Sequence, residues 1–303
     1  VTETNTPSRE NVSYFGNAND VAWIYNFSLP PILIYSILIG DSSYIEKLTM
    51  SMPPSQLGTS YLNFIASHDG IGLRPAETFL TKDEVTKFIN LMEKNGGKVS
   101  YRSNNTDTPE PYEINITLFD AMKESFHKDT DLNIERFVCI HTIMLSLEGV
   151  PAFYIHSLFG TKNAYGLYRE TNHNRALNRG SVKISDMNLN KRFSIESYIF
   201  NELKRLLLIR KKQPAFHPNA TQFTLQLEDH LFGIWRQSID RSQSIFCVSN
   251  LTKYKKKFFL YNINLIATDD WFDILKNKKI KSINTEILLQ PYQSIWISNK
   301  KYS

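Results

Sequence analysis

A histidine and an aspartate stand side by side after a short apolar run. Residues 61–66 (YLNFIA) favour a strand, and Ser67, His68 and Asp69 follow them before a glycine-rich turn. An imidazole donates hydrogen bonds, and a carboxylate accepts them or stabilises a developing positive charge. Parallel α/β folds present such side chains at the carboxyl ends of buried strands. The pair is therefore a candidate catalytic site; the alternative is an ordinary surface pair in a turn.

A strand that presents side chains in this way belongs to a set of parallel strands separated by helices. Apolar runs end near residues 3, 27, 67 and 156, and the last of them covers 152–156. Helical spacing of apolar residues is clearest over 30–39, 81–94, 115–126, 132–147 and 197–212. This alternation predicts parallel β/α units. We expect an α/β fold in which residues 1–213 form the C-terminal half of a (β/α)8 TIM barrel, with two open edges.

The pattern changes after a linker at 214–218. Short runs of alternating apolar and polar residues follow, separated by turn residues and without a helical period. They cover 222–227, 231–237, 244–248, 256–261, 285–289 and 294–297. We expect residues 219–303 to form a small antiparallel β-sandwich domain that packs on the barrel.

Composition narrows the classes of function. The 303 residues carry 35 Lys and Arg against 30 Asp and Glu, and the basic excess collects in Lys-rich runs at 253–257 and 276–281. These runs carry no nucleic-acid-binding motif, so we expect a solvated surface. No run approaches the roughly 18 apolar residues of a membrane span. Cys139 and Cys247 lie in separate apolar segments, which fits buried thiols and a reducing, cytoplasmic location. No metal-ligand spacing is present, and we expect no cofactor and no metal.

Several distinctive stretches occur in a fixed order along the chain. They are ETNTP at 3–7, ENVSYFG at 10–16, ASHDGIGLRP at 66–75, PYEIN at 111–115, FDA at 119–121, GVPAFY at 149–154 and TNHNRALNR at 171–179. In residue type and order they resemble the α-amylase superfamily of glycoside hydrolases (family 13). The details resemble its sucrose phosphorylase subfamily, which includes glucosylglycerate phosphorylases. The resemblance covers essentially the whole chain.

This resemblance implies retaining transfer of an α-glucosyl group to phosphate. The donor would be sucrose or a glucosylglycerate-like α-glucoside, and the product α-glucose 1-phosphate. Such chemistry needs a general acid/base and a nucleophilic carboxylate about 5 Å apart. By resemblance Glu3 is the acid/base, Asp69 stabilises the transition state and His68 donates a hydrogen bond to the sugar. Taken alone, Glu3 would read as a terminal surface carboxylate.

The resemblance also implies residues that bind the substrates. The segment 70–125 resembles an inserted subdomain, within which Tyr112 and Glu113 match loop residues on the acceptor side. Arg175 and Arg179 lie in a loop after the last strand, where a guanidinium would hold the donor glucose or phosphate. We favour Arg179 for the sugar; the alternative for either arginine is an ion pair with a loop carboxylate. His156, at the predicted strand end, would touch acceptor or phosphate, or serve only the structure.

One departure limits the expected activity. The superfamily's nucleophilic aspartate lies in a Gly-x-Arg-x-Asp motif, and neither this motif nor Asp-x-x-x-Asn-His occurs here. We expect both upstream of Val1, so the chain would be inactive alone and would need its missing N-terminal half, either in the same longer protein or as a separate partner chain. Two alternatives stay open: an α-glucoside hydrolase or transglucosidase on the same fold, and a non-catalytic carbohydrate-binding or assembly fragment.

Overall fold

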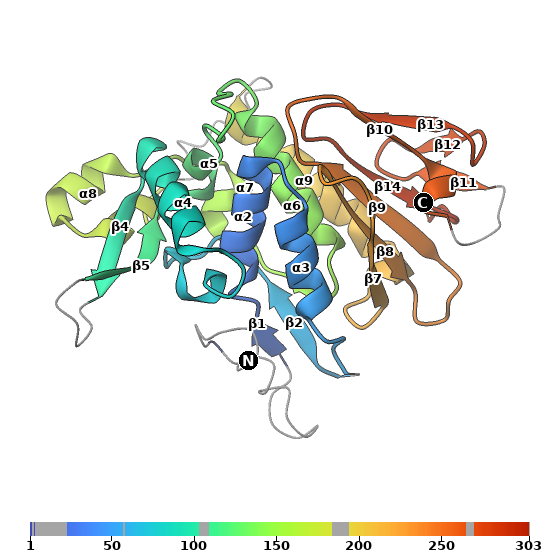
Figure 1. Cartoon of the computed structure of the whole chain (residues 1–303), viewed down its shortest axis with the longest axis horizontal. Helices are drawn as coiled ribbons and strands as arrows, with labels where there is room; N and C mark the ends of the chain where they lie inside the picture. The colour runs from blue at the N-terminus through green and yellow to red at the C-terminus, as the bar shows by residue number, and fades with distance from the viewer. Residues whose placement is uncertain are drawn as a thin grey trace.

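A computed structural model describes residues 1, 3, 23–56, 58–102, 109–183, 194–264 and 270–302 of the protein. A helix-rich part and a β-rich part lie side by side, with helices α6 (Asn133–Ser146) and α9 (Ile195–Lys211) between them (Figure 1). One hydrophobic cluster spans both parts, because residues such as Ile143 and Leu203 belong to the same buried cluster as Ile245 and Trp296, and a second cluster lies within the β-rich part. Within the described residues, no helix is both long and apolar enough to cross a membrane.

A three-stranded parallel sheet lies in the helix-rich part. Its order is β1 (Trp23–Tyr25), β2 (Ser60–Asn63) and β6 (Val150–Pro151). Ile24 pairs with Tyr61, and Leu62 pairs with Val150. Gly149 precedes β6 and has a φ of 108°. A Cβ atom at Gly149 would lie 2.5 Å from the Tyr61 carbonyl oxygen. The predicted parallel β/α arrangement is therefore present over these strands.

The strand expected to end at residue 3 is not seen at the described positions, since Val1 and Glu3 lie outside any helix or strand and Thr2 lies outside the described residues. The prediction of a complete half-barrel stays a prediction.

The prediction of a strand over 152–156 was wrong. Only residues 150–151 pair with β2, whose own strand ends at Asn63. Without a further partner the chain turns into a short helix, α7 (Ile155–Leu158), so His156 is helical.

Helices α2 (Leu29–Ile39) and α3 (Ser43–Ser51) connect β1 to β2. Pro30 and Pro31 occupy the first turn of α2, where a missing N–H costs nothing, and Gly40 ends the helix in the left-handed conformation. Nearly all of α2 is buried, which explains why its sequence is apolar on every side.

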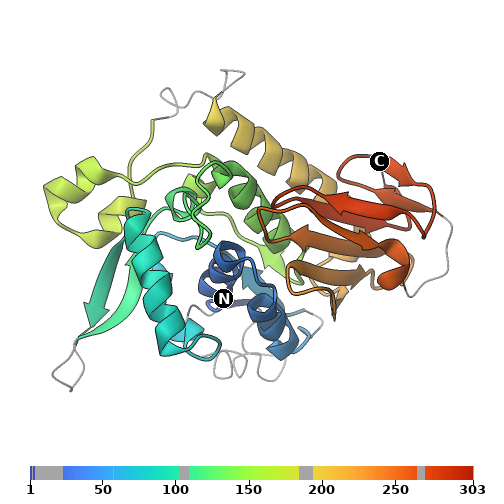
Figure 2. The same ribbon diagram turned by 45° about the horizontal axis from the view of Figure 1, so that its top comes forward.

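An antiparallel insertion follows β2. It comprises β3 (Ile71–Gly72), a 3-10 turn (Arg74–Ala76), α4 (Lys82–Lys94), β4 (Lys98–Arg102) and β5 (Glu110–Asn115), with sheet order β3-β5-β4. Figure 2 shows α4, β4 and β5 on the side away from the β-rich part. The predicted Thr81 cap of α4 is confirmed, as Thr81 and Glu84 form a reciprocal capping box.

Shorter helices lie along the chain between the insertion and α9. They are α5 (Leu118–Ala121), α8 (Tyr165–Thr171) and the 3-10 helix η2 (Asn174–Asn178). The helix predicted over 115–126 is reduced to α5, because Asn115 pairs with Lys98 in the sheet and Thr117 caps a new start. The predictions over 132–147 and 197–212 agree with α6 and α9.

The β-rich part follows a 3-10 turn, η4 (Pro214–Phe216). A six-stranded antiparallel sheet has the order β12-β11-β14-β9-β8-β7, and β10 and β13 form a second pair. The strands missed by the sequence are the short β11 and β12. The bounds are β7 (Thr221–Leu225), β8 (Leu231–Gln237), β9 (Ser244–Asn250), β10 (Lys256–Phe259), β11 (Trp271–Asp273), β12 (Lys278–Ile280), β13 (Glu286–Leu289) and β14 (Ser294–Ser298).

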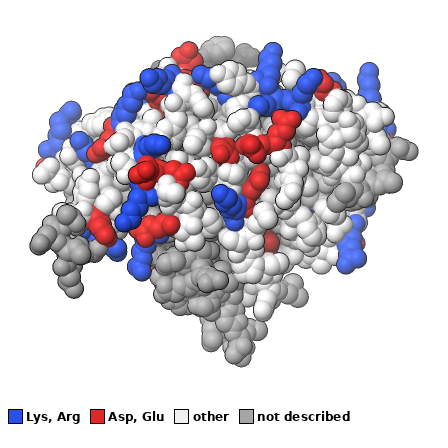
Figure 3. Space-filling view, viewed as in Figure 1, with Lys and Arg blue, Asp and Glu red and all other residues white. Residues whose placement is uncertain are grey.

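The face of the molecule seen in Figure 3 carries both signs of charge. Blue and red side chains alternate over it, and the described residues there form no continuous basic surface. That distribution agrees with the solvated surface expected from the Lys-rich runs.

Candidate active site

The His68–Asp69 pair lies in the turn between the parallel strand β2 and the insertion. The Ser67 hydroxyl accepts a hydrogen bond from the Asp69 amide at 3.2 Å. The His68 side chain is 62% exposed and its Nε2 lies 3.7 Å from Asp69 Oδ1. The turn therefore offers an imidazole and a carboxylate together at the carboxyl end of a strand.

Two arginines converge on the Asp69 carboxylate. Arg175, in η2, places Nη1 2.7 Å from Asp69 Oδ1, and Arg179, just after η2, places Nη2 3.1 Å from the same oxygen. Arg179 Nε also donates to the His68 carbonyl oxygen at 2.7 Å. These contacts from two guanidinium groups fix the orientation of the Asp69 carboxylate.

Glu113 is the most enclosed carboxylate of this network, with 4% of the residue exposed. Arg175 binds it in bidentate fashion, Nε to Oε1 at 3.0 Å and Nη2 to Oε2 at 2.7 Å. Asn115 Nδ2 donates to Oε1 at 2.7 Å and the Tyr112 hydroxyl to Oε2 at 3.1 Å. Arg175 also donates to the Tyr112 oxygen at 2.9 Å. Both predicted acceptor-side residues thus lie in strand β5, not in a loop, and they hold Arg175.

The electrostatics of this cluster follow from burial and pairing. Burial alone would raise the pKa of Glu113, but the hydrogen bonds from Arg175 and Asn115 and the Arg175 charge outweigh it and lower the pKa. The same hydrogen bonds raise the pKa of Arg175. Burial and the neighbouring Glu113 charge raise the pKa of the Tyr112 phenol. The ion pair left open as the alternative for the arginines is present at both, since Arg175 pairs with Glu113 and Asp69 and Arg179 pairs with Asp69.

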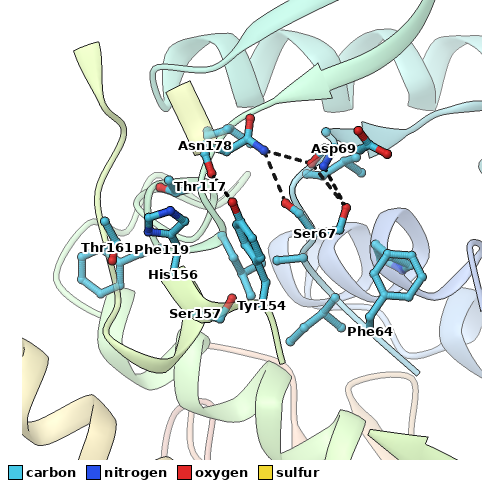
Figure 4. Close-up of a pocket in the computed structure, with 17 residues that line it drawn as sticks. Phe64, Ser67, Asp69, Thr117, Phe119, Tyr154, His156, Ser157, Thr161 and Asn178 are labelled. Atoms are coloured by element: carbon cyan, nitrogen blue, oxygen red, sulfur yellow. Dashed lines mark hydrogen bonds between the residues drawn. The ribbon is translucent and has the colours of Figure 1, made fainter. Parts of the chain in front are cut away.

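A small pocket borders the turn. Asp69 and His156 lie on opposite sides of it, with Tyr154 and Asn178 among the other lining residues (Figure 4). Its volume is about 20 Å³, room for about one water molecule and far less than a hexose needs. Burial lowers the pKa of His156, so this side chain is neutral near pH 7.

Glu3 is the predicted site residue that the structure does not join to the others. It is exposed, and among the described residues no hydrogen bond or ion pair links it to His68 or Asp69. The other predicted residues come together: His68, Asp69, Tyr112, Glu113, Arg175 and Arg179 form one network, and His156 shares the pocket with Asp69.

Sequence reasoning missed Asn178 and Tyr154. Asn178 Nδ2 donates to backbone oxygens of the His68–Asp69 turn, and the Tyr154 hydroxyl donates to the Asn178 carbonyl oxygen at 2.8 Å. The available signal was the position of Asn178 next to Arg179, inside the motif at 171–179. Among the described side chains, no group of three or more His, Cys, Asp or Glu is placed to hold a metal ion.

Solved structures define the class of fold. A sucrose 6F-phosphate phosphorylase from Thermoanaerobacter thermosaccharolyticum superposes with a TM-score of 0.66 at 15% identity, covering 88% of this chain and 47% of that one. An α-amylase from Geobacillus thermoleovorans gives 0.62 at 10% identity, covering 98% of this chain and 52% of that one. The chain therefore shares the fold of part of the α-amylase-type enzymes.

Curated sequences give a closer relationship. A glucosylglycerate phosphorylase from Allomeiothermus silvanus is 36% identical to this chain, and one from Escherichia coli is 32% identical. Each alignment covers 98% of this chain. The chain is a homologue of the glucosylglycerate phosphorylases of the α-amylase superfamily, which confirms the predicted resemblance. The aligned part is 51% and 52% of those proteins, so the chain spans about half the length of the curated relatives it matches. No protein-family model matches it.

Proposed function

We propose that the complete protein containing this chain transfers an α-glucosyl group from an α-glucoside to inorganic phosphate. The observation that carries this proposal is the pairing of His68 with an arginine-held Asp69 at the carboxyl end of β2. The homology to glucosylglycerate phosphorylases supports it. Because glucosylglycerate phosphorylases match at higher identity than sucrose phosphorylases do, glucosylglycerate is the first donor to test.

The proposed reaction has two displacements. A carboxylate outside this chain attacks the anomeric carbon, while Glu3 gives its proton to the departing oxygen of the donor. Phosphate oxygen then attacks the same carbon and breaks the glucosyl ester, and Glu3 takes up the proton that phosphate loses. The result is α-glucose 1-phosphate with the original anomeric configuration.

Asp69 and His68 would bind the sugar hydroxyls, and Asp69 would counter the positive charge of the transition state. Arg175 binds two carboxylates, Asp69 and the buried Glu113, whereas Arg179 binds Asp69 and the His68 carbonyl oxygen. Because Arg179 is held by fewer charged partners, we favour it as the cation that meets the substrate, with Arg175 as support for Asp69.

We also propose that this chain supplies the C-terminal half of a (β/α)8 barrel. The parallel strands β1, β2 and β6 and the length relative to the homologues support this. The missing half, covalent or separate, would then bring the nucleophile. Adding an N-terminal half in trans to this chain should create activity that neither half has alone.

The decisive assay measures glucose 1-phosphate released by the full-length protein from glucosylglycerate and from sucrose, with and without phosphate. We expect phosphate-dependent release, lowered about 1,000-fold in Asp69→Asn and in Glu3→Gln. Asp240→Asn, in an exposed turn of the β-rich part, is the matched control and should retain activity. Phosphate-independent release of glucose would instead assign a hydrolase. A folded full-length protein without turnover of any α-glucoside would overturn the enzyme proposal in favour of a non-catalytic carbohydrate-binding role.

A further inference from the structure

The Asn178 side chain holds three consecutive backbone carbonyls. Its Nδ2 lies 3.4 Å from the Ser67 oxygen, 3.1 Å from that of His68 and 3.0 Å from that of Asp69. The residue is 2% exposed. Three acceptors around one atom require the NH₂ group there, so the orientation of the amide is settled by its partners.

Asn178 is itself held from two sides. The Tyr154 hydroxyl, from the segment after β6, donates to the Asn178 carbonyl oxygen at 2.8 Å. The Ala164 amide, before α8, donates to the neighbouring Leu177 carbonyl oxygen at 2.8 Å. These two bonds hold the backbone of residues 177–178, from which the Asn178 side chain reaches the turn after β2; its Oδ1 atom is buried and has no hydrogen-bond partner among the described residues.

The conformation of the turn depends on this donor. Three carbonyl dipoles that point toward one buried place repel one another, and a buried carbonyl without a donor is costly. Gly70 next to the turn approaches β5 so closely that a Cβ atom would lie 2.5 Å from the Ile114 oxygen, so the turn has little room to relax in that direction. Loss of the amide would therefore displace the side chains that the turn carries.

We propose that Asn178 is a positioning residue that fixes the turn presenting His68 and Asp69. The expected loss of kcat rests on the proposed glucosyl transfer. The expected effect on the conformation of the turn does not. Asn178 does not touch the reacting atoms; it acts through the backbone of residues 67–69.

The kinetic test uses Asn178→Asp in the full-length protein, which keeps the shape of the side chain and replaces the donor by an acceptor. Displacement of the turn by about 1 Å should lower kcat by about 100-fold. KM for the α-glucoside should rise by less than kcat falls, because the displaced side chains bind the sugar in the ground state but Asp69 also counters a charge that develops only in the transition state. Asn178→Ala adds no repulsion, so its kcat should lie between those of the wild type and Asn178→Asp. It replaces the Asp variant in the test if that variant does not fold.

Asn95→Asp is the matched control. Asn95 is also buried, and its Nδ2 donates to two carbonyl oxygens, those of Ala121 and Glu124, away from the turn. It should lower the unfolding temperature as Asn178→Asp does but leave kcat within about threefold of the wild type. Equal losses of stability and kcat in both variants would assign Asn178 a purely structural role and overturn the proposal.

Amide hydrogen exchange on the chain of 303 residues gives a readout without catalysis. Peptides spanning residues 64–72 should exchange faster in the Asn178 variants, and in Asn95→Asp the faster exchange should instead appear around residues 92–97. Unchanged exchange over 64–72 would contradict the proposal. If the full-length wild type shows no glucosyl transfer, the proposed function fails while the exchange result still decides the role of Asn178.

Discussion

Glu113 carries its charge where water scarcely reaches, and four donor contacts from Arg175, Asn115 and Tyr112 surround it. Because its pKa is lowered in the folded chain, the unfolded chain binds a proton at this group more readily. The resulting stabilisation is fully present above the unfolded pKa of about 4.3. It is lost as the pH falls through the lower folded value.

We expect Glu113→Gln to reduce the free energy of unfolding at pH 7 by about 1–3 kcal/mol, since a charge-assisted bidentate pair is lost. The difference from the wild type should shrink as the pH falls below about 4.3, where unfolded Glu113 takes up a proton, and vanish below the lowered pKa of the folded chain. Urea unfolding at several pH values measures both effects.

Glu110→Gln is the control for this prediction. Glu110 lies in the same strand, β5, but its contact with Arg102 at 3.4 Å is exposed. Its loss should cost less than about 1 kcal/mol. Equal costs for the two glutamate variants would contradict the importance of the buried pair.

At the scale of elements, the insertion is fastened to the end of β2 by close backbone packing. A Cβ atom at Gly70 would lie 2.5 Å from the Ile114 oxygen and 2.6 Å from the Glu113 Cγ, both on β5. Gly70 lies between β2 and β3 in the chain, and this contact leaves no space for a side chain between Gly70 and β5. This packing brings Glu113 within reach of Arg175 and Asp69.

Gly70→Ala should therefore push β5 away from the turn and cost about 1–3 kcal/mol of stability. Gly166→Ala, in α8, is the matched control, because nothing lies within 4 Å of its new Cβ atom. That change should be neutral or stabilising by up to about 1 kcal/mol. Thermal unfolding of both variants compares them, and a Gly70→Ala protein as stable as the wild type would disprove the tight fit.

At the scale of the whole molecule, the helix-rich and β-rich parts are joined by buried polar contacts as well as by apolar packing. Arg236, on β8, is fully buried and donates to the carbonyl oxygens of Ser146 at the end of α6, His217 and Ala220. Arg136, on α6, pairs with Asp129 at 2.7 Å and lies against the Tyr292 ring of the β-rich part. Separating the two parts would therefore expose apolar side chains and leave these buried polar groups without their partners.

We expect both parts to unfold in one transition. Far-UV circular dichroism reports the helices, and in a Trp23→Phe background the fluorescence of Trp235, Trp271 and Trp296 reports the β-rich part. The two signals should give the same urea midpoint in this background. Two separate midpoints would show independent parts.

Arg236→Met should lower both midpoints together, by about 2–4 kcal/mol in free energy of unfolding, because buried carbonyl oxygens lose their donors. The exposed Arg169, on α8, gives the control Arg169→Met, which should change the free energy of unfolding by less than about 0.5 kcal/mol.

The sequence by itself determined the elements whose signals are local. Apolar periodicity and the Thr81 cap predicted α4, and alternation predicted strands such as β7 and β13, because these patterns record which face of an element is buried. The order of motifs also determined the family. It placed His68 and Asp69 at the end of a strand, as the structure has them.

Only the tertiary structure decided which side chains meet. Glu113 and Arg175 are 62 residues apart, and nothing local in either segment specifies that pair. The turn of the chain into α7 at His156 depended on where β2 ran out of pairing positions, and the role of Asn178 depended on three carbonyls in another segment. Such contacts are set by packing between distant elements, so a pattern read along one segment does not contain them.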